Sequence, residues 1–264
     1  MSSAKRRKKS MKKRDWRRLA RFLRNMLLIV MGVLAVYYFT QSPFFALKNI
    51  EVSGNTKVTE TEIINKSGLS TGINYFELDT ELVEKRLHSI PLVEVVAVKK
   101  RPPDSVVVNI KERKPLARFC TQEGLLVIDG QGYCLEKCTT AVSYDLPIIT
   151  GLKPDSQNPG EQVINSDNLR VVLAALEQDV QQNFSEVNIA EADNLIAYTR
   201  QGIPVFLGTT KKLSEKLDIA VSYLNLLVDV DGIEYIDIRS IQAPAVKCQD
   251  EITKGDNLFS LLEN

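Results

Sequence analysis

The sequence lacks the residues and motifs from which most enzyme active sites are built. It contains a single histidine, His88, so any His-dependent catalytic triad would have to use that one side chain, and nothing near it supports such a role. There is no His-Glu-x-x-His motif, no phosphate-binding loop and no Gly-x-Gly-x-x-Gly motif. We therefore predict that the chain is not an enzyme and that it uses no catalytic residues, no cofactor and no metal ion.

Charge is absent from one long stretch and concentrated just before it. Residues 1–24 hold twelve Lys or Arg and one acid, Asp15, whereas Asn25 to Leu47 carries no charge. At about 1.5 Å per residue that run reaches roughly 34 Å, enough to cross a hydrocarbon core of about 30 Å. Because Lys and Arg stay on the cytoplasmic side of a spanning helix, we predict a basic cytoplasmic tail at 1–24 and a transmembrane helix at 25–46. All later residues are then outside the cytoplasm.

A cleaved signal peptide is the alternative interpretation of this segment. Its strictly apolar part, Met26 to Phe39, has the length of a signal-peptide core. However, aromatic residues at 37–39 stand where a cleavable signal needs small ones, and Phe44 and Phe45 extend an aromatic belt of the kind found at membrane interfaces. We therefore predict a retained anchor, whose basic residues set its topology and contact anionic lipid.

Positive charge is scarce in the rest of the chain. Beyond residue 24 there are 22 basic and 32 acidic residues. Although the net charge of the whole chain is near zero, its outer part is therefore acidic. An acidic surface is unsuited to the phosphate backbone of nucleic acids. The length of this outer part allows one or two domains with hydrophobic cores of their own.

Residues 47–114 show the pattern of a small α+β domain. Thr59 and Glu62 form a capping box that begins a first helix. Asp79 or Thr80 can cap a second helix, which Pro91 stops. The elements expected are, in order, a strand at 47–55, these two helices, and strands at 93–99 and 105–111.

Residues 115–248 read as a second, mixed α+β domain with a mainly antiparallel sheet. A hairpin is expected at 125–135, and helices are expected after Ser166 and Thr210. Further strands are predicted at 187–189, 195–199, 205–207 and 233–238. Residues 249–264 are expected to be a flexible tail that frays or contacts a partner.

The four cysteines leave three interpretations open. Cys120, Cys134, Cys138 and Cys248 all lie in the outer part, where an oxidising compartment permits disulfides. Cys120 could pair with Cys134 or Cys138 and close a loop of roughly 15–19 residues. Free buried thiols and a four-cysteine zinc site are the alternatives, although the spacing is loose for zinc.

The order of these segments resembles a known family. A β-α-α-β-β module directly after one N-terminal anchor looks like a POTRA domain, and the whole pattern resembles the bacterial cell-division family FtsQ/DivIB. The stretches that carry the resemblance are 50–55 (IEVSGN), 91–98 (PLVEVVAV), Pro103 with Val108, Ile110, Glu112, Pro115 and Ala117, 124–132 (GLLVIDGQG), 146–151 (LPIITG) and 235–239 (YIDIR).

The resemblance implies a non-enzymatic scaffold of the division machinery. Members of this family bind FtsB/DivIC- and FtsL-like bitopic proteins, and through them act on the septal peptidoglycan synthase. The chain would then be located in the cytoplasmic membrane at the division septum. A membrane-tethered cell-wall hydrolase and a POTRA-type export or assembly accessory protein are the alternatives.

The resemblance also points to where partners would bind. The last strand of a sheet offers unpaired N–H and C=O groups to an incoming strand, and the candidate edge runs from Tyr235 through Val246. Ile236 and Ile238 would face the core, and Arg239 could bind an acidic partner. A plain core strand is the alternative for 235–239. The candidate partner-binding residues are Tyr235, Asp237, Ile238, Arg239, Ile241 and Val246.

Two further lysines are candidates for recruitment to the division site. Lys99 and Lys100 follow the Val-rich strand of the first domain and could contact an acidic partner or a lipid surface.

Pro244 departs from the family pattern, and because proline cannot donate to a strand ladder, pairing is expected to stop there.

Overall fold

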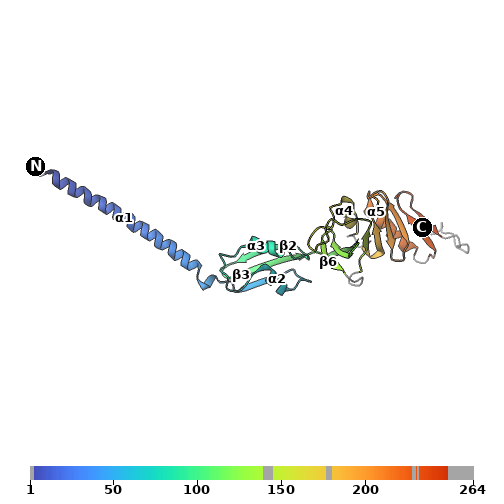
Figure 1. Ribbon diagram of the computed structural model, residues 1–264, viewed down its shortest axis with the longest axis horizontal. Helices are drawn as coiled ribbons and strands as arrows, with labels where there is room; N and C mark the ends of the chain where they lie inside the picture. Colours follow the sequence, from blue (N-terminus) through green and yellow to red (C-terminus); the bar gives the residue numbers. More distant parts are fainter. Residues whose placement is uncertain (1–2, 139–144, 177–179, 228–229, 231, 249–264) are drawn as a thin grey trace. The chain divides into compact units, whose positions relative to one another are not determined.

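The computed structural model describes residues 3–138, 145–176, 180–227, 230 and 232–248, with side chains described from residue 16 onward. The chain forms two compact units (Figure 1). The first unit comprises Met1–Leu87 and Val96–Ile110, and the second comprises His88–Val95 and Lys111–Asn264. The predicted tail at 249–264 lies outside the described residues.

The N-terminal helix α1 spans Ser3–Thr40 and ends before the predicted boundary at residue 46. A turn follows, and then the short 3-10 helix η1, Pro43–Phe45, whose first turn is capped by the Ser42 side chain. The uncharged part of α1, residues 25–40, therefore reaches only about 24 Å. Trp16–Thr40 is long and apolar enough to cross a membrane, with basic residues included at its start.

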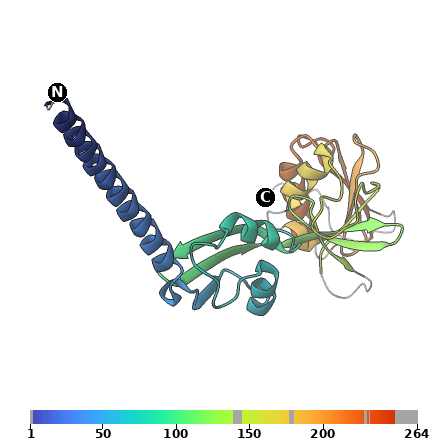
Figure 2. The same cartoon turned by 60° about the vertical axis from the view of Figure 1, so that its left-hand side comes forward.

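The first unit has its elements in the predicted β-α-α-β-β order after α1. They are β1 (Asn49–Ser53), α2 (Glu60–Ser67), α3 (Thr80–Leu87), β2 (Val93–Arg101) and β3 (Ser105–Glu112). The sheet order is β1-β3-β2, with β1 parallel to β3. Figure 2 shows the helices beside this small sheet.

The local signals in this unit act as the sequence indicated. The Thr59 hydroxyl accepts the Glu62 backbone N–H at 3.2 Å, and the Asp79 carboxylate accepts that of Leu82 at 3.1 Å. Both are N-caps that satisfy donors left free by the first turn of a helix. Gly54 has a φ of 85°, and a Cβ there would collide with the Ile110 carbonyl, so glycine is required where β1 ends against β3.

The second unit contains a mixed, twisted sheet. In order along the sheet its described strands are β12 (Ala245–Cys248), β11 (Ile233–Asp237), β10 (Pro204–Gly208), β9 (Leu195–Thr199), β8 (Phe184–Asn188), β7 (Ile148–Thr150), β4 (Pro115–Thr121), β5 (Gly124–Asp129) and β6 (Cys134–Cys138). The pairings β10–β11, β7–β8 and β4–β7 are parallel, and the other neighbouring pairs are antiparallel. The expected α+β class is thus confirmed.

Two helices cover one face of this sheet. These are α4 (Asp167–Leu176) and α5 (Leu213–Leu226), which lie side by side (Figures 1 and 2), with the 3-10 helix η2 (Val180–Asn183) against them. Their apolar residues join those of the strands in one core cluster. The predicted cap of α5 at Thr210 is wrong: the helix begins after Lys212, whose side chain makes no capping bond.

Candidate partner-binding site

The nine-stranded sheet ends in β12, a strand of four residues. It pairs on one side with β11 in antiparallel register, with Tyr235 opposite Lys247, Ile236 opposite Val246 and Asp237 opposite Ala245. No described strand pairs with its other side. Unpaired backbone groups on an edge strand are a template for another chain, so β12 is the candidate partner-binding edge.

The position of this edge corrects the prediction from sequence. The predicted edge from Tyr235 through Val246 is two strands with a connection between them, so Tyr235 and Asp237 lie in the second strand of the sheet. Ile238, Arg239 and Ile241 lie in the connection, and Val246 alone of the six candidates lies in the edge strand. The prediction that pairing stops at Pro244 is wrong: Pro244 directly precedes β12, where its missing N–H costs no ladder bond, and pairing with β11 begins at Ala245.

Ile238 holds the connection in the core. Its side chain is fully buried, as is that of Ile236, which confirms that both face inward. The Ile238 backbone N–H donates to the Phe206 carbonyl at 2.9 Å. An acidic residue at 238 would therefore disrupt the domain itself, which makes this position unsuitable for testing partner capture.

Arg239 is already engaged within the chain. Its Nε lies 3.0 Å from both carboxylate oxygens of Asp237, and a second guanidinium nitrogen completes the contact. Hydrogen bonding from Arg239 lowers the pKa of Asp237, and the carboxylate in turn raises the pKa of Arg239. A partner carboxylate would have to displace Asp237, so the predicted role of Arg239 as a clamp is weakened.

The edge strand also carries a lysine that was not predicted as part of the site, beside the predicted Tyr235. Lys247 in β12 forms an ion pair with Glu234 at 2.8 Å, and its ammonium lies 5.6 Å from the Tyr235 ring centroid. The Tyr235 ring in turn packs edge-on against Phe206, with centroids 5.4 Å apart. The missed signal was the alternation in 245–248, where Lys247 shares a sheet face with Tyr235.

Lys99 and Lys100 do not form one surface. Both lie inside β2, an outer strand of its sheet, so their side chains point to opposite faces. Lys99 is exposed. The Lys100 ammonium donates to the Tyr75 carbonyl at 3.2 Å and lies 5.4 Å from the Tyr75 ring centroid.

The structure contains no disulfide among the cysteines, because the strand register keeps them apart. Cys120 and Cys138 both stand opposite Leu125, from β4 and β6, so a whole strand separates them. Cys134 lies four residues before Cys138 on the same strand. Strands stand about 4.8 Å apart, so two intervals exceed the Cα separation that a disulfide spans. Burial raises the pKa of the Cys134 thiol to about 11.

The titratable groups of the described region are not arranged as a catalytic set. His88 is exposed, and no group of three or more His, Cys, Asp or Glu residues in that region could hold a metal ion. The buried charges are used in packing: Arg113 pairs with Asp129 at 2.6 Å and stacks on the Tyr133 ring. Lys216, also missed from the sequence, donates to two backbone carbonyls.

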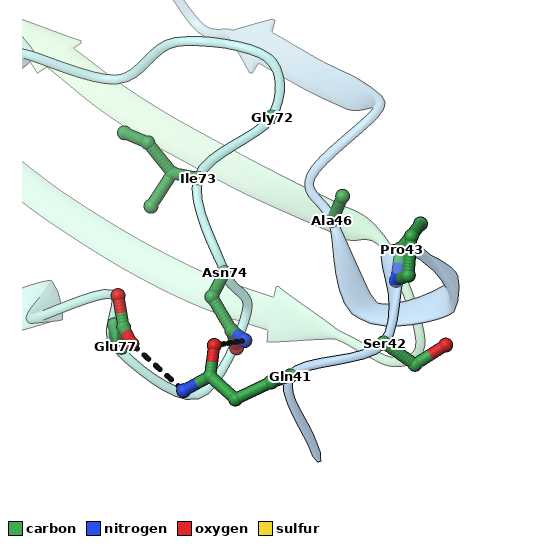
Figure 3. Close-up of a pocket in the computed structure, with 8 residues that line it drawn as sticks. All are labelled: Gln41, Ser42, Pro43, Ala46, Gly72, Ile73, Asn74 and Glu77. Atoms are coloured by element: carbon green, nitrogen blue, oxygen red, sulfur yellow. Dashed lines mark hydrogen bonds between the residues drawn. The ribbon is translucent and has the colours of Figure 1, made fainter. Parts of the chain in front are cut away.

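The end of α1 is joined to the first unit by a polar network. The Gln41 side chain donates to Glu77 at 3.0 Å and accepts from Asn74 at 3.3 Å, while Asn74 also donates to the Thr40 carbonyl at 2.8 Å. Figure 3 shows these side chains at a cavity of about 520 Å³. Three side chains thus fix the segment after α1 to the loop between α2 and α3.

Two family models match the chain in consecutive regions. Residues 45–113 match the POTRA domain, FtsQ-type, and residues 117–239 match the C-terminal domain of the cell division proteins FtsQ/DivIB. Together they cover well over half of the chain. The second match ends at Arg239, so strand β12 lies beyond it.

Individual relatives agree with these models. The cell division protein DivIB of Clostridium tetani is 28% identical over 227 residues, which are 83% of this chain and 85% of that protein. The cell division protein FtsQ of Myxococcus fulvus is 30% identical over 188 residues, 69% of this chain and 65% of that protein. The solved major extracytoplasmic domain of the trans isomer of DivIB from Geobacillus stearothermophilus aligns at 20% identity with a TM-score of 0.34, covering 46% of this chain and 98% of that one.

Proposed function

The chain belongs to the FtsQ/DivIB family of cell division proteins, and on that premise we propose that it is a non-enzymatic scaffold of the divisome. In this role it binds FtsB/DivIC- and FtsL-like bitopic proteins outside the cytoplasmic membrane. Through that complex it helps to control septal peptidoglycan synthesis. Family membership supports the division role, and the partners are our inference from the resemblance.

The observation that carries the proposal is the open edge of β12. A partner strand laid beside Ala245–Cys248 would extend the sheet through backbone hydrogen bonds. Lys247 and Ala245 are exposed on this strand, and Tyr235 and Asp237 flank it on the same face. We propose these residues, with Val246 supporting the strand from the core side, as the partner-binding site.

The proposed membrane topology of the chain follows from its charge distribution. The basic segment at 1–24 precedes the apolar part of α1, and positive charge favours the cytoplasmic side. All residues after α1 are then outside the cytoplasm, with the partners. We propose the division septum as the place where the anchored chain acts.

The opposite edge of the same sheet provides a matched control for the experiment. Lys137 in β6 and Lys247 in β12 are both exposed lysines on the terminal strands of one sheet. A photo-crosslinking amino acid at each position, in the full chain in dividing cells, should capture the FtsB/DivIC-like partner from 247 and not from 137. Capture from 137 alone, or from neither position, would contradict the assignment of the edge.

Lys99 is our candidate for recruitment in the first unit, because its ammonium, unlike that of Lys100, is exposed on the strand surface. A fluorescent fusion carrying Lys99→Glu should lose its midcell band, whereas Lys57→Glu in the same unit should keep it. A midcell band that survives Lys99→Glu would remove this residue from the proposal. A uniform membrane signal from the unmodified fusion would contradict the septal role itself.

A further inference from the structure

A chain of aromatic contacts joins the end of α1 to a loop of the first unit. The Phe39 ring packs edge-on against Phe45 with centroids 5.2 Å apart, and Phe45 packs against Phe76 at 4.9 Å. Phe44 and Tyr75 join the cluster through Phe45 and Phe76, at 5.0 and 5.5 Å. Five aromatic rings, from α1, η1 and the loop between α2 and α3, therefore form one patch, which we call the aromatic platform.

Backbone hydrogen bonds hold the platform together. The Tyr75 N–H donates to the Phe45 carbonyl, the Leu47 N–H to Ile73, and the Gly72 N–H to Leu47, each at 2.8 Å. The Gln41 network in Figure 3 adds side-chain bonds between the same two segments. The loop that carries Phe76 is thus fixed against the residues that directly follow the apolar helix.

The platform is apolar and largely uncovered within the chain. Phe39, Phe44 and Phe76 are 63%, 57% and 54% exposed. A contiguous apolar patch of this kind on a soluble surface marks an interaction site. The aromatic platform is therefore expected to contact a partner molecule or the membrane.

We infer that the aromatic platform, and Phe76 in particular, sits in the interfacial layer of the outer membrane leaflet as a second lipid contact besides α1. The inference rests on the proposed membrane anchoring. Two centroid steps of 5.2 and 4.9 Å place the Phe76 ring within about 10 Å of Phe39, on the last turns of the apolar helix. The interfacial layer is roughly 5–8 Å thick on each side of the hydrocarbon core, and aromatic side chains concentrate there.

Two observations favour lipid over a protein as the occupant. First, the patch is continuous with the membrane-spanning helix, since its first member, Phe39, belongs to α1 itself. Second, the Lys100 ammonium donates to the Tyr75 carbonyl and lies near the Tyr75 ring, so a basic residue borders the aromatic side chains, as basic and aromatic residues do together at membrane interfaces. The uncharged part of α1, about 24 Å long, is shorter than a hydrocarbon core of about 30 Å. The residues just beyond Thr40 are therefore expected close to the interface.

The test uses the full chain in lipid vesicles. Trp16 is the only native tryptophan, so Trp16→Phe gives a silent background for single probes. Phe76→Trp reports on the platform, Leu34→Trp on the apolar helix, and Lys57→Trp on the turn at the other end of β1. Brominated lipids should quench the fluorescence of the Phe76→Trp variant several-fold more than that of the Lys57→Trp variant.

The three probes separate the possible failures. If the platform probe is quenched no more than the probe at position 57, while the probe at position 34 is strongly quenched, the lipid contact is overturned and the anchor stays intact. Weak quenching of the helix probe as well would overturn the anchoring and the inference together. Quenching at position 76 that is lost when the FtsB/DivIC- and FtsL-like partners are co-reconstituted would assign the platform to a protein and overturn the inference too.

A second comparison does not depend on probes. Phe76→Ser and Leu82→Ser each remove one exposed apolar side chain from the first unit, but only Phe76 is in the platform. Hydrogen exchange of the loop at 72–77 on vesicles should rise several-fold in Phe76→Ser and stay unchanged in Leu82→Ser. Equal exchange in both variants would contradict the inference.

Discussion

The two units present different kinds of surface to their surroundings. In the first unit, exposed aromatic side chains gather where the apolar helix α1 ends. In the second unit the large apolar side chains are mostly buried in one core, and the feature left open is a strand edge made of backbone. Aromatic side chains can contact lipid without forming directional hydrogen bonds, whereas the N–H and C=O groups of an edge strand can pair with another protein strand. If both proposals hold, the comparison teaches that one chain can separate anchoring from recognition by the type of group that it exposes.

The largest effect should come from placing a charge in the core behind the edge. Ile238→Asp removes a fully buried side chain and buries a carboxylate without a partner, so we expect at least about 4 kcal/mol of lost stability. Urea unfolding followed by circular dichroism measures this. A folded variant with unchanged stability would break the distinction between the core and the open surface.

A buried ion pair should matter next. Asp129 accepts from Arg113 and from the backbone N–H groups of Gln131 and Tyr133, and its side chain is 7% exposed. Asp129→Asn leaves Arg113 buried without its counter-charge, so we expect a loss of about 2–4 kcal/mol. The same unfolding measurement checks it, and a loss below that of the exposed pair at 237 would contradict the expectation.

The exposed ion pair beside the edge should contribute less. Arg239 is largely exposed, so Asp237→Asn is expected to cost under about 1 kcal/mol at neutral pH. Because the folded-state pKa of Asp237 is lowered, this contribution is present above the unfolded pKa of about 3.9 and is lost as the pH falls through the folded value. Unfolding curves of the two proteins should therefore converge below about pH 4.

The smallest change in stability should come from the aromatic platform. Phe76 is more than half exposed, so Phe76→Ser is expected to alter stability by no more than about 0.5 kcal/mol. Thermal unfolding of the full chain in detergent measures it. A large loss would show that Phe76 holds the first unit together, which would remove the contrast between the two surfaces.

Local signals in the sequence predicted much of the fold. The caps at Thr59 and Asp79 and the alternation in β3 were enough to place the elements of the first unit, because each depends on neighbours within a few residues. The end of α1 was misplaced because an uncharged run does not reveal where a helix stops, and here Pro43 and the Gln41 network end it. Cap chemistry at Thr210 was also misleading, since the residue directly before α5 is Lys212, which adopts a left-handed conformation.

The candidate site depended on information that neighbours along the chain do not hold. Which strand becomes the edge is decided by sheet order, so 235–246 could not be divided into β11 and β12 from alternation alone. Strand β4 was not among the predicted strands, although its apolar residues follow a strand pattern. The burial of Lys216 has no sequence signal, because its partners are carbonyl groups near the end of β10.

The four described residues of β12 have a kinetic consequence for the proposed pairing. Four residues span about 13 Å, and in a strand only alternate residues turn their N–H and C=O groups toward an incoming chain. On the proposed pairing, few backbone hydrogen bonds therefore form between β12 and the partner strand. Each single binding event should have a short residence time. On the same proposal, confinement of both partners to one membrane would raise their effective concentration and compensate for this. The complex would then persist through repeated rebinding, and it could be dismantled quickly once the partners are no longer held side by side.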